Sequence, residues 1–441
     1  MLTKFLFTKI DNSSLIVFRA IFGLLIFLES IGAILTGWVR KTLIDPIFTF
    51  NFIGLEFLQP LQGNGMYYYF VIMGLFGFFV MIGYRYRFSI IAFTLMWAGV
   101  YFMQKASYNN HYYLLLLLCL IMLVLPANSY FSLDAKKHPE QQKIWMYSWC
   151  KWLIVFQLLV VYTYAAIAKL YTGWLDLSFI KVLMGSKWDY PLVGDVLQNE
   201  SVHWVLMVSG IAFDFLIIPL LLIKKTRKWA FIAAIVFHLF NSVIFQIGIF
   251  PYMSLALCLF FFEPKTIRNL FLKRKPLYTA AEVDKPSYHK LVLIIGTVYA
   301  IIQIGLPSRH WFIEDPVLWT EEGHRMSWRM MLRSKAGIIE FKVLNHSTKE
   351  LRTVDLNAYL SAKQRRIIAS KPDVIWQFAQ RLKNEYKTKG DDISVFAVQS
   401  RISINGGPWE DFVKPNVDLA AQPWNYFGHE HWIFPYKKAS K

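Results

Sequence analysis

A single lysine interrupts an apolar stretch of this 441-residue chain. Lys169 ends a run, from about Ile154, that is otherwise apolar enough to cross a bilayer. Two explanations are open. The side chain could extend its amine to the lipid headgroups, with Trp174 in the interfacial aromatic belt. Alternatively, Lys169 could be the working group of a site, because a buried amine favours its neutral form and can then accept a proton from a weak acid.

Two histidines lie in comparable surroundings. His111 follows Asn109 and Asn110 at the start of an apolar run, and His238 lies midway along another run that also carries Asn241. Ionisable groups in such runs are costly and need a reason. Each histidine also has an ordinary explanation, either as a loop residue or as a buried imidazole bonded to a neighbouring helix. With the lysine, they make three groups that could transfer protons, for example with a lipid-soluble hydroquinone.

The remaining polar signals favour structure over chemistry. Arg19, Glu29 and Asp214 also lie within apolar runs, and we expect them to be structural ion pairs or hydrogen-bond partners. The sequence has no P-loop, GxGxxG, HExxH or GxSxG pattern. The three cysteines lie in apolar runs without metal-ligand spacing, so we expect neither a disulfide framework nor a metal site.

The elements that must position these residues are membrane helices. Hydrophobic residues make up 56% of the chain and charged residues only 17%, and the mean hydropathy is +0.37. The apolar residues gather in blocks of membrane-spanning length. We therefore predict a polytopic all-α membrane domain over residues 1–306 with about nine transmembrane helices. The predicted spans are residues 15–37, 67–83, 88–104, 112–126, 148–171, 203–223, 229–247, 249–263 and 290–306.

The basic residues of the loops predict the orientation of these spans. The N-terminus and the loops after even-numbered spans carry 17 Lys and Arg residues, whereas the loops after odd-numbered spans carry five. Because basic loops stay on the cytoplasmic side, the N-terminus is predicted to be cytoplasmic. The same bias accounts for the net charge of +18 without a nucleic-acid partner. An odd number of spans then places the rest of the chain outside.

The C-terminal part has a different pattern. GIIEFKVL (337–344) and DDISVFAVQSRISI (391–404) are typical of strands, and KPDVIWQFAQRLKNEYK (371–387) is typical of an amphipathic helix. We predict a small extracytoplasmic α+β domain over residues 307–441 that lies against the outer membrane face.

Several separated segments, in this order, resemble the vitamin K-dependent γ-glutamyl carboxylase family and its bacterial relatives, which share an HTTM-type membrane domain. NNHYYL (109–114) is similar to the family's Asn-Asn-His motif, and AIAKLYTGW (166–174) to the segment with its catalytic lysine. FHLFNSVIFQIGIFPY (237–252) is similar to its His-Asn-Ser helix. The other similar segments are FRAIFGLLIFLES (18–30), WTEEGHRMSWRMMLRSK (319–335), SRISING (400–406) and KPNVDLAAQPW (414–424). The resemblance runs from about residue 15 to 436.

The resemblance implies a particular chemistry. Family enzymes use reduced vitamin K or menaquinol, O2 and CO2 as co-substrates. A lysine deprotonates the hydroquinone, and O2 addition gives a strongly basic alkoxide that removes the γ-hydrogen of a glutamate in a peptide or protein. CO2 then adds to the carbanion, and the quinone leaves as an epoxide. Exclusion of water matters, because water would quench so strong a base.

The resemblance also implies roles for individual residues. Lys169 corresponds to the catalytic base. His111 would manage the carbanion, CO2 or a proton, with Asn110 orienting it. The remaining residues implied to bind substrate or quinone are Asn109, His238, Asn241, Trp328, Arg329, Met330, Met331 and Arg333.

The sequence departs from the animal members of the family in three respects. The chain stops at Lys441, where the animal enzymes continue into a further external domain, and it lacks the cysteines of their external disulfide. The region of Tyr171–Gly173 is more acidic in the animal enzymes. We therefore expect a bacterial relative in the inner membrane. Two alternatives stay open: a quinol-dependent oxidoreductase, or epoxidase, without carboxylation, and a non-enzymatic transporter or membrane scaffold.

Overall fold

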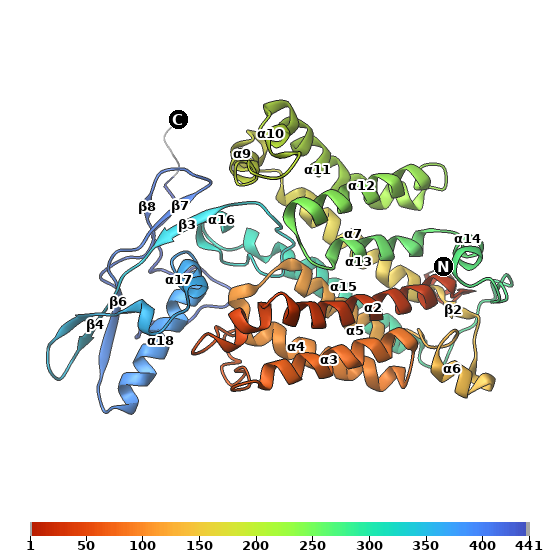
Figure 1. Cartoon of the computed structure of the whole chain (residues 1–441), viewed down its shortest axis with the longest axis horizontal. Helices are drawn as coiled ribbons and strands as arrows, with labels where there is room; N and C mark the ends of the chain where they lie inside the picture. The colour runs from red at the N-terminus through yellow and green to blue at the C-terminus, as the bar shows by residue number, and fades with distance from the viewer. Residues whose placement is uncertain (1, 438–441) are drawn as a thin grey trace.

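The computed structural model describes residues 2–437 and is mostly helical. Within that range, seven helices are long and apolar enough to cross a membrane (Figure 1). Their long apolar runs explain why they form, because every backbone polar group must be satisfied within the helix in lipid. They are α2 (Ser13–Leu35), α3 (Gly65–Ile82), α4 (Tyr86–Met103), α7 (Ser148–Ala168), α11 (Glu200–Leu222), α12 (Arg227–Phe245) and α15 (His289–Ser308).

Two further apolar helices fall on the fourth and eighth predicted spans. These are α5 (Asn110–Val124) and α13 (Phe250–Leu257), which continues as the 3-10 helix η4 (Cys258–Phe261). At about 1.5 Å per residue, both are shorter than a bilayer core of about 30 Å. The predicted count of nine transmembrane helices is therefore not confirmed, although a multi-helix membrane domain is.

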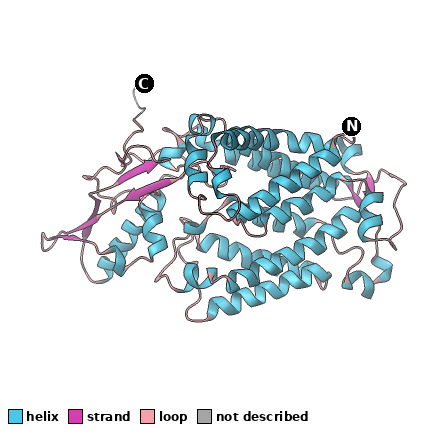
Figure 2. Ribbon diagram, turned by 45° about the horizontal axis from the view of Figure 1, so that its top comes forward, coloured by secondary structure: helices cyan, strands magenta, loops and turns pink. Residues whose placement is uncertain are grey.

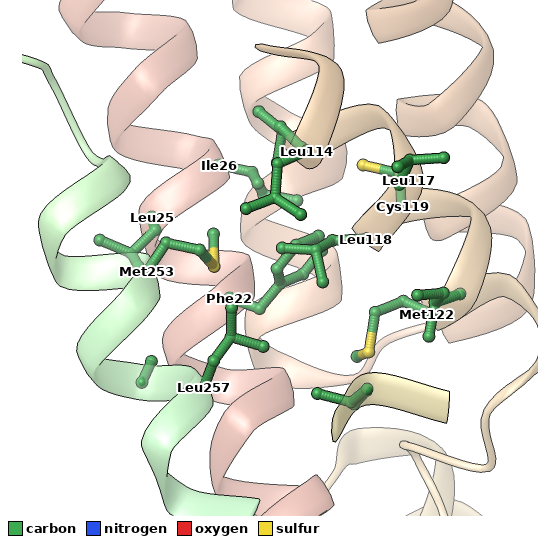
Figure 3. Close-up of a cluster of buried hydrophobic side chains, with 14 of the residues drawn as sticks. Phe22, Leu25, Ile26, Leu114, Leu117, Leu118, Cys119, Met122, Met253 and Leu257 are labelled. Carbon is green, nitrogen blue, oxygen red and sulfur yellow. The ribbon is translucent and has the colours of Figure 1, made fainter. Parts of the chain in front are cut away.

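The two short helices α5 and α13 are well covered by their neighbours. Figure 3 shows side chains of α2, α5 and α13 that meet in one buried cluster, among them Phe22, Leu118 and Met253. Most residues of α5 are buried, including Leu114 and Met122. Since its neighbours cover it, α5 does not need to match the thickness of the lipid by itself.

Glycines bring α2 and α3 into close contact. A Cβ built on Gly23 would lie 2.2 Å from the backbone nitrogen of Met81, and one on Gly77 would lie 2.9 Å from that of Phe27. No side chain fits in either place, so these glycines allow the two backbones to approach, as small residues do in membrane helix pairs.

The two ends of the helical bundle differ. The N-terminus lies at one end, beside a two-stranded antiparallel sheet, and the C-terminal strands lie at the other end (Figure 1). The N-terminal end holds α1 (Leu2–Leu6), β1 (Lys9–Asp11), α6 (Leu133–Lys137), β2 (Trp145–Tyr147) and α14 (Pro264–Phe271). Three short helices connect α7 to α11: α8 (Thr172–Leu175), α9 (Ser178–Gly185) and α10 (Gly194–Leu197).

The C-terminal part combines helices with two small antiparallel sheets (Figure 2). One sheet has the order β3–β7–β8 and the other β5–β4–β6. Its helices are α16 (Val317–Thr320), α17 (Ala362–Ile368) and α18 (Pro372–Thr388). Its strands are β3 (Lys335–Ile338), β4 (Phe341–Asn345), β5 (Leu351–Thr353), β6 (Ile393–Ala397), β7 (Arg401–Ile404) and β8 (Glu410–Asp411).

This C-terminal core also includes a segment of the membrane part. Phe48 and Phe50, in the connection between α2 and α3, are buried with Phe341 and Phe378. The side-chain amide of Gln364 donates to the carbonyl of Phe48 at 2.7 Å. The two parts of the chain therefore pack against each other through shared side chains.

Candidate functional site

Lys169 lies at the point where α7 ends. It is the C-cap residue of that helix, and its backbone nitrogen still bonds to the carbonyl of Ala166 at 3.0 Å. The side chain is buried, with the residue only 8% exposed. Its amine lies 5.5 Å from the ring centre of Trp174, on the next short helix. The amine is thus enclosed by protein and does not extend to a solvent-exposed surface.

The amine of Lys169 has an acidic partner. Its Nζ contacts Oδ2 of Asp214 on α11 as a hydrogen-bonded ion pair, and Asp214 is 5% exposed. A longer contact of 3.4 Å joins Nζ to the carbonyl of Ala165. Gly210, one helical turn before Asp214, lies against the same groups, since a Cβ built there would lie 3.3 Å from the ring of Trp174 and 3.9 Å from Cε of Lys169.

The two histidines contact the same aromatic side chain. The ring of His111 stacks on Phe250 with centres 4.0 Å apart, and the ring of His238 meets Phe250 edge-on at 6.3 Å. Nε2 of His238 also lies 3.1 Å from the hydroxyl of Tyr162. Asn241, one turn after His238, donates to the carbonyl of Phe237 in its own helix at 2.9 Å.

These groups line one cavity of about 680 Å³. Its walls come from α5, α7, α8, α9, α11, α12 and α13 and from the loop with Met330 and Met331, and they are otherwise mostly apolar. Six of the residues predicted from the sequence lie in the wall: Lys169, His111, His238, Asn241, Met330 and Met331. Volume and composition are those of a site for a largely apolar small molecule held by a few polar groups.

The other predicted residues lie behind this wall. The side chain of Asn109 caps α5 by accepting from the backbone nitrogen of Tyr112 at 2.7 Å. Asn110 donates to the carbonyl of Arg329 at 3.2 Å and so joins the start of α5 to the 326–333 loop. These contacts hold the start of α5, which carries His111, and they do not reach the cavity.

The 326–333 loop has an unusual backbone. Met326, Trp328 and Met331 have φ values of +60°, +58° and +50°. Non-glycine residues avoid this left-handed region unless their surroundings hold them there. Trp328 is 1% exposed and packs on Tyr113 with ring centres 5.0 Å apart. This packing fixes the loop that presents Met330 and Met331 to the cavity.

The two arginines of this loop belong to a buried charge cluster above the cavity. Nε of Arg333 donates to Glu321 at 2.5 Å, and Nη1 of Arg329 lies 3.4 Å from Nε2 of His310. Lys335 and Lys371 also pair with Glu321.

This cluster changes the protonation of its members. Burial alone would raise the pKa of Glu321, but Arg333, Lys371 and Lys335 hold it well below its ordinary value. Burial lowers the pKa of Lys335 to about 7 and that of Lys371 to about 8, against the attraction of Glu321. An excess of cationic side chains therefore lies beside the loop.

Asp214 is an ion-pair partner, as its position in an apolar run predicted. The sequence did not show that its partner is Lys169 or that the pair lies at a cavity. Of Arg19, Glu29 and Asp214, only Asp214 lines the cavity. Arg19 instead donates to the carbonyl of Phe131 at 2.6 Å, and Glu29 lies near the turn between α12 and α13, with Oε2 3.4 Å from a Cβ built on Gly248. Phe250, which joins the two histidines, carried no signal of its own.

Comparison with protein families gives two matches that together cover most of the chain. A family described as "HTTM domain" matches residues 7–265. A second, described as "Vitamin K-dependent gamma-carboxylase, lumenal domain", matches residues 288–439. No solved structure matches significantly. The cavity thus lies in the first region, with Met330 and Met331 added from the second.

Proposed function

Because the chain belongs to the HTTM-domain vitamin K-dependent gamma-carboxylase family, we propose that it is a membrane enzyme that carboxylates glutamate side chains. The carboxylation, a reaction of the carbon–carbon lyase class, is coupled to epoxidation of reduced vitamin K or menaquinol with O2 and CO2. The observation that carries this proposal is the convergence of Lys169, His111 and His238 on one apolar cavity.

The residues of the cavity fit a reduced naphthoquinone. A volume of about 680 Å³ accommodates a fused bicyclic ring, and the aromatic and aliphatic walls suit its apolar faces. The amine of Lys169 is available to a ring hydroxyl inside the wall. When bound, the reduced quinone, with O2, supplies a base strong enough to remove the γ-hydrogen of glutamate.

The chain's own residues have separate tasks in this proposal. Lys169 accepts the proton of the quinol hydroxyl at Nζ. His111 transfers the proton or binds CO2 at the glutamate carbon. Asn110 holds the start of α5, which carries His111. His238 and Asn241 orient the quinone from the α12 side, and the 326–333 loop shields the reacting groups from water.

The glutamate-containing peptide or protein would approach from the extracytoplasmic side. We place the N-terminus in the cytoplasm and the C-terminal domain outside a bacterial inner membrane, as the loop charges predict. The cationic cluster of Arg329, Arg333, Lys335 and Lys371 then lies on the side from which an acidic substrate arrives.

The test uses the purified protein with reduced menaquinone or vitamin K, O2, 14C-labelled bicarbonate and a glutamate-containing peptide. We expect label in the peptide, and loss of label by on the order of 10²–10⁴-fold in Lys169→Ala. Lys181→Ala, which changes a half-exposed lysine on α9, is the matched control.

Other results would select other functions. Quinol epoxidation without peptide labelling would assign the protein as a quinol-dependent oxidoreductase. A well-folded sample without any quinol turnover would overturn the enzymatic proposal and favour a transporter or scaffold.

A further inference from the structure

Lys169 and Asp214 are the two oppositely charged side chains of the cavity wall. They come from different helices, 45 residues apart, and each is at least nine-tenths buried. The titratable side chains that share the wall with this pair, within residues 2–437, are His111, Tyr162 and His238. Tyr162 and His238 are bonded to each other, and His111 stacks on Phe250.

Two polar residues near the pair have partners elsewhere. Tyr171, two residues after Lys169, donates its hydroxyl to the carbonyl of Leu332. Arg329, on the loop that covers this side, has His310 as its side-chain contact. Asp214 is therefore the carboxyl group that the amine of Lys169 faces.

A proton acceptor in an apolar cavity meets a specific obstacle. When a neutral amine takes a proton from a neutral hydroxyl, a cation and an anion form where little water can solvate them. A carboxylate already in contact with the amine stabilises the cation as it forms. The aspartate of a serine protease has this role toward its histidine.

We propose that Asp214 is the positioning residue that gives Lys169 its strength as a base. Its carboxylate orients Nζ into the cavity and provides the counter-charge for the ammonium that is formed when Nζ takes the hydroxyl proton. The O–H bond of the substrate breaks, an N–H bond forms on Lys169, and the negative charge stays on the substrate oxygen. This inference rests on the proposed function, because it assumes a weakly acidic hydroxyl as the proton donor.

The first measurement needs no substrate. The purified chain is treated with phenyl isothiocyanate across a pH series, and modification of Lys169 is followed by mass spectrometry, because only the neutral amine reacts. Asp214→Asn removes the counter-charge and is expected to move half-maximal modification to lower pH. Asp214→Glu is expected to restore the wild-type pH, and Glu200→Gln, an exposed acid on the same helix, is expected to leave it unchanged.

The second measurement is the rate of quinol epoxidation against pH. In Asp214→Asn we expect the acidic limb to move to lower pH and the maximal rate to fall by on the order of 10²-fold, with partial recovery in Asp214→Glu. An Asp214→Asn protein that reacts with the isothiocyanate at the wild-type pH would overturn the inference. If wild type shows no quinol turnover, the proposed function fails, whereas the modification result still decides the role of Asp214.

Discussion

Phe250 contacts both imidazoles of the cavity, which come from different helices. His111 is at the start of α5, next to the loop of the C-terminal domain, and His238 is on α12, bonded to Tyr162. In the proposed function, the two histidines therefore act at different steps. His111, on the side of the C-terminal domain, is the one proposed to meet the glutamate side chain.

His111→Ala is therefore expected to uncouple the two reactions. Carboxylation should fall by on the order of 10²-fold relative to quinol epoxidation, because Lys169 and the quinone walls stay in place. The measurement is the ratio of labelled carboxylate to quinone epoxide. His138→Ala, an exposed histidine after α6, is the control. Equal losses of both products would assign His111 to the quinone step or to structure.

The sequence could name the groups of the cavity but not their contacts. Lys169, His111, His238 and Asn241 were predicted because ionisable or polar residues in apolar runs need a reason, and the family resemblance gave their roles. Which helix faces Lys169 depends on how α7 and α11 pack, and no local pattern encodes that. The sequence therefore predicted that Asp214 has a structural partner but not that this partner is Lys169.

At the scale of elements, hydrophobic runs predicted the long helices well. The helix predicted at 371–387 is confirmed as α18 (Pro372–Thr388). The stretch 337–344 is extended, as predicted, but divides between β3 and β4, which belong to different sheets. An alternating pattern identifies extended chain and does not reveal which strand will pair with it.

The connection before α5 and the start of α18 are joined by buried charges. Nζ of Lys105 lies 2.7 Å from Oδ2 of Asp373, and Nη1 of Arg325 lies 2.5 Å from the same oxygen. Burial would raise the pKa of Asp373, but Arg325 and Lys105 hold it below its ordinary value of 3.8. Its contribution to stability is therefore complete above about pH 4 and is lost as the pH falls toward the folded-state pKa.

Asp373→Asn should remove this dependence. We expect it to lower the free energy of unfolding at neutral pH by about 3–5 kcal/mol, because two buried cations lose their partner. The difference from wild type should shrink below pH 4. Thermal unfolding followed by tryptophan fluorescence at pH 7 and at acid pH measures both, with Asp391→Asn as control. A constant difference across this range would contradict the ion-pair account.

At the scale of the whole molecule, the two ends of the helical bundle can be compared with the distribution of basic loop residues. The N-terminus and the C-terminal domain lie at opposite ends of the helical bundle (Figure 1). Lys275, in a basic loop, pairs with Asp11 at the N-terminal end. The division at residue 306 and the side of the membrane on which each part lies remain predictions.

Cysteine labelling tests the orientation. The native cysteines at 119, 150 and 258 are free and buried, so an introduced cysteine can be followed alone. In intact spheroplasts, a membrane-impermeant maleimide should label Lys387→Cys, and Lys273→Cys should react only after the membrane is opened. The reverse pattern would place the C-terminal domain in the cytoplasm and contradict the loop-charge prediction.

The central claim is that Lys169 starts a reaction in which quinol oxidation drives carboxylation. The most direct measurement follows quinone epoxide and peptide-bound 14C in the same reaction, with wild type, Lys169→Ala and Lys181→Ala. The account predicts that both products form in wild type and Lys181→Ala and that both are lost together in Lys169→Ala, at unchanged folded protein. Carboxylation that persists in Lys169→Ala would contradict it.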